Sequence, residues 1–239
     1  MYTYQIRIPY SAIGEDGRLR PAELIDAFQN CSTFQSEALG IGPAYAIRKQ
    51  EAWLVASWNI ELKCLPVFAE EVSVSTWPYK MDRFFGYRNF TMHDTKGDLL
   101  ACADSCWFYF DNQKQALIRA TEEMKEILGR EIEPVFSMEK QPRKIALPEG
   151  MEKLPPFSVR RSDLDTNHHM NNGRYVHYAA EYLPTDAAVR RIRVEYVKAA
   201  MPEDTVYPEV RIDAGTTTVN LAQEDGKPFA VIEFLTEKE

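Results

Sequence analysis

The sequence lacks any apolar run of about 18 residues, the length that a membrane-spanning helix needs. It also lacks an N-terminal basic segment followed by an apolar one, so we expect no signal peptide. Cysteine is scarce, and the four residues Cys31, Cys64, Cys102 and Cys106 contain no C-x-x-C pair. Scattered cysteines in apolar surroundings are typical of buried thiols in a reducing compartment, so the sequence predicts a cytoplasmic protein.

Positive charge is also in short supply. The formal net charge is −8, which weighs against nucleic acid as a partner because nucleic-acid binding depends on cationic contacts to phosphate. The basic residues of the C-terminal half nevertheless cluster in sequence: Arg160, Arg161, Arg174, Arg190, Arg191, Arg193 and Lys198. The cluster is either a solvated face of mixed charge or a docking site for an acidic partner.

What is present is a pattern of elements that occurs twice. Residues 21–39 are expected to form a helix: Pro21 suits the first helical position, Gly40 ends the helix, and apolar residues recur at helical spacing, namely Leu24, Phe28, Cys31, Phe34 and Ala38. Four segments rich in aromatic and β-branched residues then predict strands at 53–62, 72–79, 84–93 and 99–110, with a hairpin turn at 94–97. The aromatic residues are expected to fill the core, or in part to line an apolar tunnel in this half.

The C-terminal half repeats this order. A strand at 157–160, a helix at 172–183 and strands at 190–198, 205–213, 216–222 and 229–235 are expected, with a turn at 224–227. Between the halves lie a short predicted helix at 122–128 and a proline-containing linker. The sequence therefore predicts an α+β fold in which an antiparallel sheet wrapped around one helix is duplicated, with domains at 1–128 and 157–239 and the linker at 129–156.

A dense polar segment, residues 163–172, precedes the second predicted helix. The free N–H groups at a helix N-terminus favour an anion or a polarised carbonyl oxygen, and fixed donors of this kind stabilise a developing oxyanion. Asn167 adds a side-chain donor, and His169 is suited to proton exchange near neutral pH. Asp165 is able to orient the imidazole, or to act itself as base or nucleophile. This set suits attack on an acyl carbonyl.

The other polar residues of this segment have simpler interpretations. Asn171 and Asn172 are expected to cap the helix, Asp163 to form a turn, and His168 to face solvent. His177 is interpreted as an ordinary residue on a helix face. Neither a metal nor another cofactor is expected, because adjacent imidazoles seldom converge on one ion.

The segment resembles the motif Asp-Leu-Asp-x-Asn-x-His-x-Asn-Asn of plant plastid and bacterial acyl-acyl-carrier-protein thioesterases, here Asp163-Leu164-Asp165-Thr166-Asn167-His168-His169-Met170-Asn171-Asn172. The layout from Trp53 to Trp107 is similar to the same family. The resemblance implies two fused hot-dog domains, an acyl chain held in the N-terminal domain, and hydrolysis of the thioester between a fatty acyl chain and the phosphopantetheine of acyl carrier protein. It assigns the catalytic roles to Asp165, Asn167 and His169.

One departure from the family concerns the segment after the predicted strand at 190–198. Where relatives carry Glu and, in plants, Cys, this chain has Ala199 and Ala200. Catalysis would then depend on water activated by Asp165 or His169, with Glu203 or Asp204 as substitute carboxylates. Two alternatives stay open, an acyl-coenzyme A thioesterase and a non-catalytic acyl-binding protein, as does pairing into a homodimer.

Overall fold

The chain forms two compact units in the computed structural model, which describes residues 1–185 and 187–237. Unit 1 consists of Met1–Ala56 and Lys63–Glu139. Unit 2 consists of Ser57–Leu62 and the chain from Lys140 onward. Each unit is built from an antiparallel sheet and a helix on its face, as the repeated pattern of the sequence predicts.

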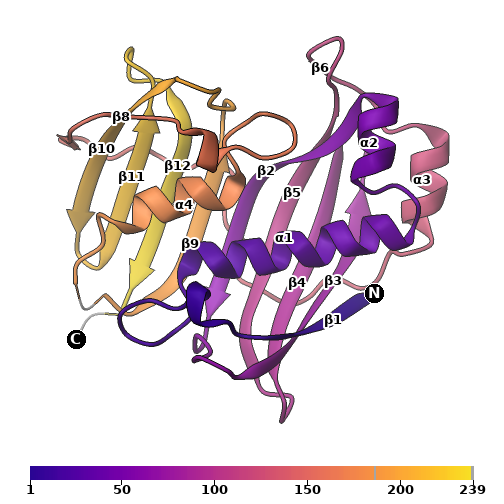
Figure 1. Cartoon of the computed structure of the whole chain (residues 1–239), viewed down its shortest axis with the longest axis horizontal. Helices are drawn as coiled ribbons and strands as arrows, with labels where there is room; N and C mark the ends of the chain where they lie inside the picture. Colours follow the sequence, from indigo (N-terminus) through magenta and orange to yellow (C-terminus); the bar gives the residue numbers. More distant parts are fainter. Residues whose placement is uncertain (186, 238–239) are drawn as a thin grey trace. The chain divides into compact units, whose positions relative to one another are not determined.

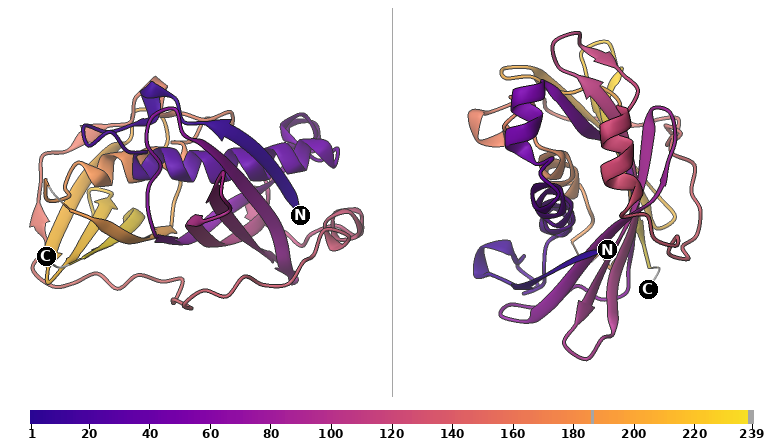
Figure 2. Two further views of the ribbon diagram at one scale, coloured as in Figure 1. Left: turned by 90° about the horizontal axis from the view of Figure 1, so that it is seen from below. Right: turned by 90° about the vertical axis from the view of Figure 1, so that its right-hand side faces the viewer.

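Unit 1 contains an antiparallel sheet in the order β1-β3-β4-β5, with β6 paired to β5. Figure 1 shows the long helix α1 lying across the face of these strands, and Figure 2 (right) views the helix nearly end-on. The elements are β1 (Tyr2–Arg7), α1 (Pro21–Ala38), α2 (Pro43–Lys49), β2 (Glu51–Leu62), β3 (Glu71–Met81), β4 (Phe85–Asp94), β5 (Leu99–Asp111), β6 (Ala116–Leu117) and α3 (Glu122–Gly129).

The buried face of α1 differs from the predicted one. Leu24, Phe28 and Cys31 are fully buried, as expected. Phe34 is instead 47% exposed, where its ring packs edge-on against Tyr4 at 5.3 Å, and Ala38 is exposed as well. Gln35 is the buried residue of that turn, because its amide bonds to a buried arginine described below. Apolar spacing alone therefore misplaced the inner face in the second half of the helix.

Unit 2 repeats the arrangement around a shorter helix. The end of β2 pairs with β9, and the order continues β9-β12-β11-β10-β7, with β8 also paired to β10. Helix α4 lies across β11 and β12 (Figure 1). The elements are β7 (Glu152–Lys153), β8 (Phe157–Ser158), α4 (Asn172–Ala180), β9 (Val189–Tyr196), β10 (Thr205–Asp213), β11 (Thr216–Ala222) and β12 (Pro228–Thr236).

The proline-containing segment after α3 has an extended course (Figure 2, left). Its first part is held on unit 1: Trp77 Nε1 donates to the Pro134 carbonyl at 2.9 Å, and Phe136 N–H donates to Asn89 Oδ1 at 2.8 Å. Such contacts hold the backbone in place although it has no regular secondary structure.

The structure confirms the α+β class, but some local predictions were wrong. The strand β1 and the helix α2 were not predicted, and the predicted strand at 157–160 is paired only over β8. Cys31, Cys102 and Cys106 are buried as expected, whereas Cys64 is exposed in the turn after β2. None of the helices in the described residues is long and apolar enough to span a membrane.

Candidate active site

The polar segment folds into a closed loop directly before α4. Leu164 and Met170 form an isolated antiparallel bridge, and we call residues Leu164–Met170 the site loop. Within it, Asp165 N–H donates to the His169 carbonyl at 2.8 Å, and His168 N–H donates to the Asp165 carbonyl at 3.1 Å. His168 adopts a left-handed conformation with φ of 59°, which lets the chain reverse direction.

The carboxylate of Asp165 is held by the backbone of its own loop. Oδ1 accepts the N–H groups of Asn167 at 2.8 Å and His169 at 3.2 Å, while Oδ2 lies 3.5 Å from the Asn167 amide. Asp165 thus contacts His169 through the backbone amide and not through the imidazole. One carboxylate oxygen is fixed by two N–H donors, and the other faces the amide of Asn167, so the group has a defined orientation.

The three predicted site residues share this loop at the N-terminus of α4. Asn167 is exposed, whereas Asp165 and His169 are half-buried. Asn171 is the N-cap of α4, where its Oδ1 accepts the Gly173 N–H at 2.9 Å, and Asn172 is the first helical residue. His168 is exposed as expected, and His177 lies half-buried on α4, where its ring is nearly perpendicular to the ring of Tyr178.

Asp163 has a structural environment that differs from that of Asp165. Its side chain has 0% exposure, and it accepts hydrogen bonds from Arg160 N–H at 2.8 Å, Arg174 Nε at 3.0 Å and Tyr178 Oη at 3.0 Å. These bonds tie the turn before the site loop to α4. The sequence predicted a turn residue here; the contacts add a buried ion pair with Arg174.

Unit 1 contains a loop with the same backbone hydrogen bonds. Ile13 and Leu19 form the matching bridge, and we call residues 13–19 the counterpart loop. Gly14 N–H donates to the Arg18 carbonyl at 2.8 Å, and Gly17 N–H donates to the Gly14 carbonyl at 3.0 Å, as Asp165 and His168 do in the site loop. Gly17 has a positive φ of 74°, like His168. The two loops therefore correspond position by position.

The turn that follows β2 corresponds in the same way to the turn that follows β9. Leu19 N–H donates to the Pro66 carbonyl at 2.8 Å, and Met170 N–H donates to the Ala200 carbonyl at 3.0 Å. Pro66 is thus the counterpart of Ala200. The following carboxylates cap both turns, because Glu70 accepts the Val67 N–H and Asp204 accepts the Met201 N–H.

This internal correspondence separates residues that the fold requires from residues that it does not. The counterpart loop carries Gly14, Asp16 and Arg18 where the site loop carries Asp165, Asn167 and His169. Since both loops close in the same way, the amide and the imidazole are not needed for folding. A carboxylate caps the same backbone position in both loops, because Asp16 Oδ1 accepts the Arg18 N–H at 2.9 Å as Asp165 Oδ1 accepts the His169 N–H. Asp204 has a structural counterpart in Glu70, and Glu203, an exposed residue with φ of 71°, has one in Ala69 with φ of 66°. The correspondence thus explains both acidic residues as parts of the turn.

Tyr175 was not predicted as a site residue. It is 2% exposed, and its hydroxyl accepts the Ala200 N–H at 2.9 Å. Burial raises the pKa of Tyr175 to about 12, and the charges of Asp165 and Asp204 raise it as well, against the lowering effect of the Ala200 bond. Periodicity predicts only that this residue faces inward on α4. The signal that was missed is the difference between the two repeats, because unit 1 has the apolar Leu24 where unit 2 has a tyrosine.

The arginines of β9 are engaged within unit 2. Arg190 pairs with Glu237 at 2.6 Å and Arg193 with Glu233 at 2.7 Å, while Arg191 lies 3.6 Å from Glu61. Arg193 also donates to the Pro142 carbonyl. For these three arginines the contacts fit the first of the two interpretations of the basic cluster, a face of mixed charge. Arg160 and Arg161 are exposed next to the site loop and form no ion pair within the described residues.

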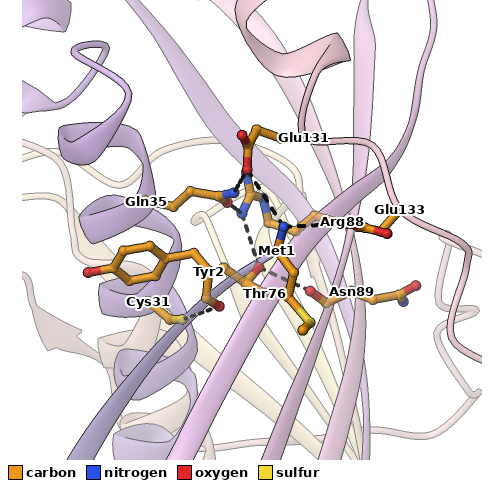
Figure 3. A network of polar contacts seen from close by, with 9 residues as sticks. All are labelled: Met1, Tyr2, Cys31, Gln35, Thr76, Arg88, Asn89, Glu131 and Glu133. Carbon is orange, nitrogen blue, oxygen red and sulfur yellow. Dashed lines mark hydrogen bonds and ion pairs between the residues drawn. The ribbon is translucent and has the colours of Figure 1, made fainter.

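Unit 1 has a buried polar network of its own (Figure 3). Arg88 on β4 is 9% exposed, and its Nη1 donates to Gln35 Oε1 at 2.5 Å and to Thr76 Oγ1 at 3.0 Å. Gln35 Nε2 in turn donates to Glu131 Oε2 at 3.0 Å. Burial lowers the pKa of Arg88 to about 10, while the charges of Cys31 and Glu131 favour its protonated form.

Metal ions in proteins are bound mainly by His, Cys, Asp and Glu side chains. Within residues 1–185 and 187–237, no group of three or more His, Cys, Asp or Glu side chains is arranged to hold a metal ion.

Family models match both halves of the chain. The acyl-ACP thioesterase N-terminal domain matches residues 1–128, and the acyl-ACP thioesterase C-terminal domain matches residues 148–227. The chain belongs to the acyl-ACP thioesterase family. The site loop lies within the part matched by the C-terminal domain, and the counterpart loop within the part matched by the N-terminal domain.

Several thioesterases are similar to this family member. Oleoyl-acyl carrier protein thioesterase 2 of Arabidopsis thaliana is 25% identical over 174 residues, which cover 64% of this chain and 46% of the relative. The palmitoyl-acyl carrier protein thioesterase of Cuphea hookeriana is 29% identical over 145 residues, covering 56% and 34%. The matched part therefore amounts to half or less of the length of these relatives.

Two bacterial crystal structures have the same fold over almost the whole chain. A putative oleoyl thioesterase from Lactobacillus plantarum superposes with a TM-score of 0.87 at 24% identity, covering 100% of this chain and 97% of its own. An acyl-ACP thioesterase from Bacteroides thetaiotaomicron gives the same TM-score at 22% identity, covering 98% and 97%. At these identities the likeness concerns the fold, and it confirms the predicted pair of hot-dog domains.

Proposed function

We propose that this acyl-ACP thioesterase family member hydrolyses fatty acyl thioesters of acyl carrier protein at the site loop. The observation that carries the proposal is the confinement of Asp165, Asn167 and His169 to one of two loops with the same backbone structure. A polar, reactive side chain that folding does not require is expected to take part in binding or catalysis. Membership of the family and the names of its relatives support a thioester substrate.

In the proposed reaction, Asp165 accepts a proton from the attacking water. Its two backbone N–H bonds fix the carboxylate, and positioning of this kind lowers the entropic cost of reaching the transition state. Asn167 and the N-terminal end of α4 supply donors for the carbonyl oxygen as negative charge develops on it. As the C–S bond breaks, His169 donates a proton to the departing thiolate sulfur, and the proton that Asp165 took from the water is returned to His169 at the end of the cycle. No covalent intermediate is needed, so alanine at positions 199 and 200 is compatible with this route.

The test is release of free thiol from acyl-carrier-protein thioesters. We expect Asp165→Ala and His169→Ala to lower kcat by about 100-fold or more each, the usual scale for loss of a general acid or base. Arg18→Ala is the matched control, because Arg18 occupies the position of His169 in the counterpart loop. Wild-type rates in both site variants would show that the assigned roles are wrong.

A second candidate is a protein that binds acyl groups without hydrolysing them. Ala199 and Ala200 favour it, since the family resemblance places a carboxylate and, in plants, a thiol at these two positions. Tight binding of an acyl-carrier-protein thioester, measured by calorimetry across acyl lengths, together with no thiol release, would favour this candidate. Matched acyl-coenzyme A thioesters in the same assay distinguish the donor.

A further inference from the structure

The guanidinium of Arg88 uses only one of its nitrogens in the buried network of unit 1 (Figure 3). Both N–H groups of Nη1 are engaged, one by Gln35 Oε1 at 2.5 Å and the other by Thr76 Oγ1 at 3.0 Å. In the part of the chain that the structure describes, Nε and Nη2 donate to no protein atom. Neither of these two nitrogens is completely enclosed, so a small group is able to reach them.

This guanidinium carries a positive charge in a buried position. Arg88 is 9% exposed, and burial lowers its pKa only to about 10, so the side chain is protonated at neutral pH. Glu131 accepts Gln35 Nε2 at 3.0 Å, and Gln35 therefore stands between this carboxylate and the guanidinium. No described carboxylate forms an ion pair with Arg88. A buried charge without a directly bonded counter-charge is unfavourable, and an absent ligand is one explanation for it.

Unit 2 shows that the fold does not need a cation at this place. The two capped turns align β3 with β10, and the strand pairing then places Thr217 at the position of Arg88. Val210 occupies the position of Thr76 in the same way. Both residues of unit 2 are buried and uncharged. The charged network is therefore specific to unit 1, and it is not a requirement of the repeated sheet.

The free side of the guanidinium has a defined chemical preference. Nε and Nη2 present two parallel N–H groups, the arrangement that matches the two oxygens of a carboxylate. The neighbouring residues on the same face of the sheet, Val74, Phe90 and Met92, are apolar and fully buried, and Phe28 of α1 packs against Phe90 at 5.3 Å. A single charged group in apolar surroundings is typical of a site that holds an apolar ligand by its one polar end.

We propose that unit 1 binds the carboxylate of a fatty acyl compound, with Nε and Nη2 of Arg88 as the two donors. Two compounds offer this chemistry. One is the free fatty acid, which is the product of hydrolysis, and the other is an acyl thioester whose chain ends in a second carboxyl group. The binding itself does not depend on catalysis; only the source of the carboxylate rests on the function proposed above.

Calorimetry with decanoate and decanamide tests the inference, because the two probes differ in charge but hardly in shape. We expect the protein to bind decanoate at least about 10-fold more tightly, the scale of a charge-assisted pair. Arg88→Lys keeps the charge without the paired donors, and Arg88→Gln removes the charge; each should bring the two affinities within about three-fold. Arg193→Lys is the matched control, since Arg193 has 12% side-chain exposure but is paired with Glu233, and it should leave the preference unchanged.

Equal affinities of the unaltered protein for the two probes would overturn the inference without any variant. A preference for decanoate that survives in Arg88→Lys or Arg88→Gln would overturn it as well, because the carboxylate would then bind elsewhere. Urea unfolding identifies variants that are folded before the titrations. Arg88→Gln is the safer of the two in this respect, since it leaves no buried charge behind.

Rates of thiol release distinguish the two sources of the carboxylate. Inhibition of decanoyl-carrier-protein hydrolysis by decanoate, lost in Arg88→Gln, identifies the product as the ligand. A KM at least about five-fold lower for the thioester with a distal carboxyl group, also lost in Arg88→Gln, identifies a dicarboxylic substrate. An active enzyme that shows neither effect would overturn the assignment. Binding of decanoate at Arg88 by a protein that releases no thiol would count against the proposed function alone.

Discussion

At the scale of single residues, Asp163 and Asp165 show how position decides the role of a carboxylate. Asp163 is fully buried and holds Arg174, Tyr178 and the Arg160 amide. Asp165, two positions later, is half-buried, and its carboxylate accepts the Asn167 and His169 N–H groups of its own loop. We therefore expect the first to contribute to stability and the second to activity.

Alanine substitution at the two positions should give opposite results. Asp163→Ala leaves Arg174 without its carboxylate and should lower the free energy of unfolding by about 2–3 kcal/mol, less than for a fully buried pair because Arg174 is 34% exposed. Asp165→Ala should change stability by less than about 1 kcal/mol. Urea unfolding measures both. Equal destabilisation by the two variants would contradict the division of roles.

At the scale of elements, the Arg88 network connects α1, β3 and β4 with the segment that follows α3. Thr76 on β3 has 0% exposure, accepts the Arg88 donor, and donates to the Asn89 carbonyl at 3.0 Å. Gln35 extends the network to Glu131. A buried guanidinium is costly unless its donors are satisfied, so these partners hold the second half of α1 against the sheet.

Thr76→Val tests this function of the network, because valine preserves the shape and removes the hydroxyl. We expect the free energy of unfolding to fall by about 1–3 kcal/mol, the cost of leaving buried polar groups without a partner. Thr3→Val is the control, since Thr3 is exposed and its hydroxyl bonds Ser75 at the edge of the sheet. Similar losses in the two variants, measured by chemical denaturation, would contradict a special role for the buried site.

At the scale of the whole molecule, the duplication leaves one loop that combines a carboxylate, an amide and an imidazole and one loop that has neither the amide nor the imidazole. Under the hydrolysis proposed above, the carrier protein binds near the site loop, where Arg160 and Arg161 are exposed. The arginines of β9 are already paired with Glu237, Glu61 and Glu233. Exposed, unpaired cations mainly accelerate and orient the encounter with an acidic partner.

Charge reversal of Arg160 and Arg161 should therefore raise KM for the carrier-protein thioester. We expect an increase of about 5- to 20-fold at low salt that shrinks as salt is added, because exposed charges are screened. The effect should be smaller with the matched coenzyme A thioester. Lys49→Glu/Lys96→Glu, which changes exposed lysines of unit 1 by the same charge, is the control. An equal rise in KM in the control would indicate a general effect of net charge.

The sequence by itself determined the class of the fold, its duplication, and the loop that contains Asp165, Asn167 and His169. These features depend on local signals: apolar periodicity, turn residues, and a contiguous polar motif before a helix. The same signals located most strands and the hairpin turn with Gly97. They did not find β1, which is an edge strand defined by its pairing with β3.

Only the tertiary structure decided which polar residues are structural. Gln35 replaces Phe34 on the inner face of α1 because Arg88, distant in sequence, requires an acceptor there. The paired arginines of β9 and the Tyr175–Ala200 bond likewise depend on partners brought together by folding. Local periodicity carries no information about such distant partners, and hydrogen bonds between them determine whether a buried polar group stabilises the fold or serves the site.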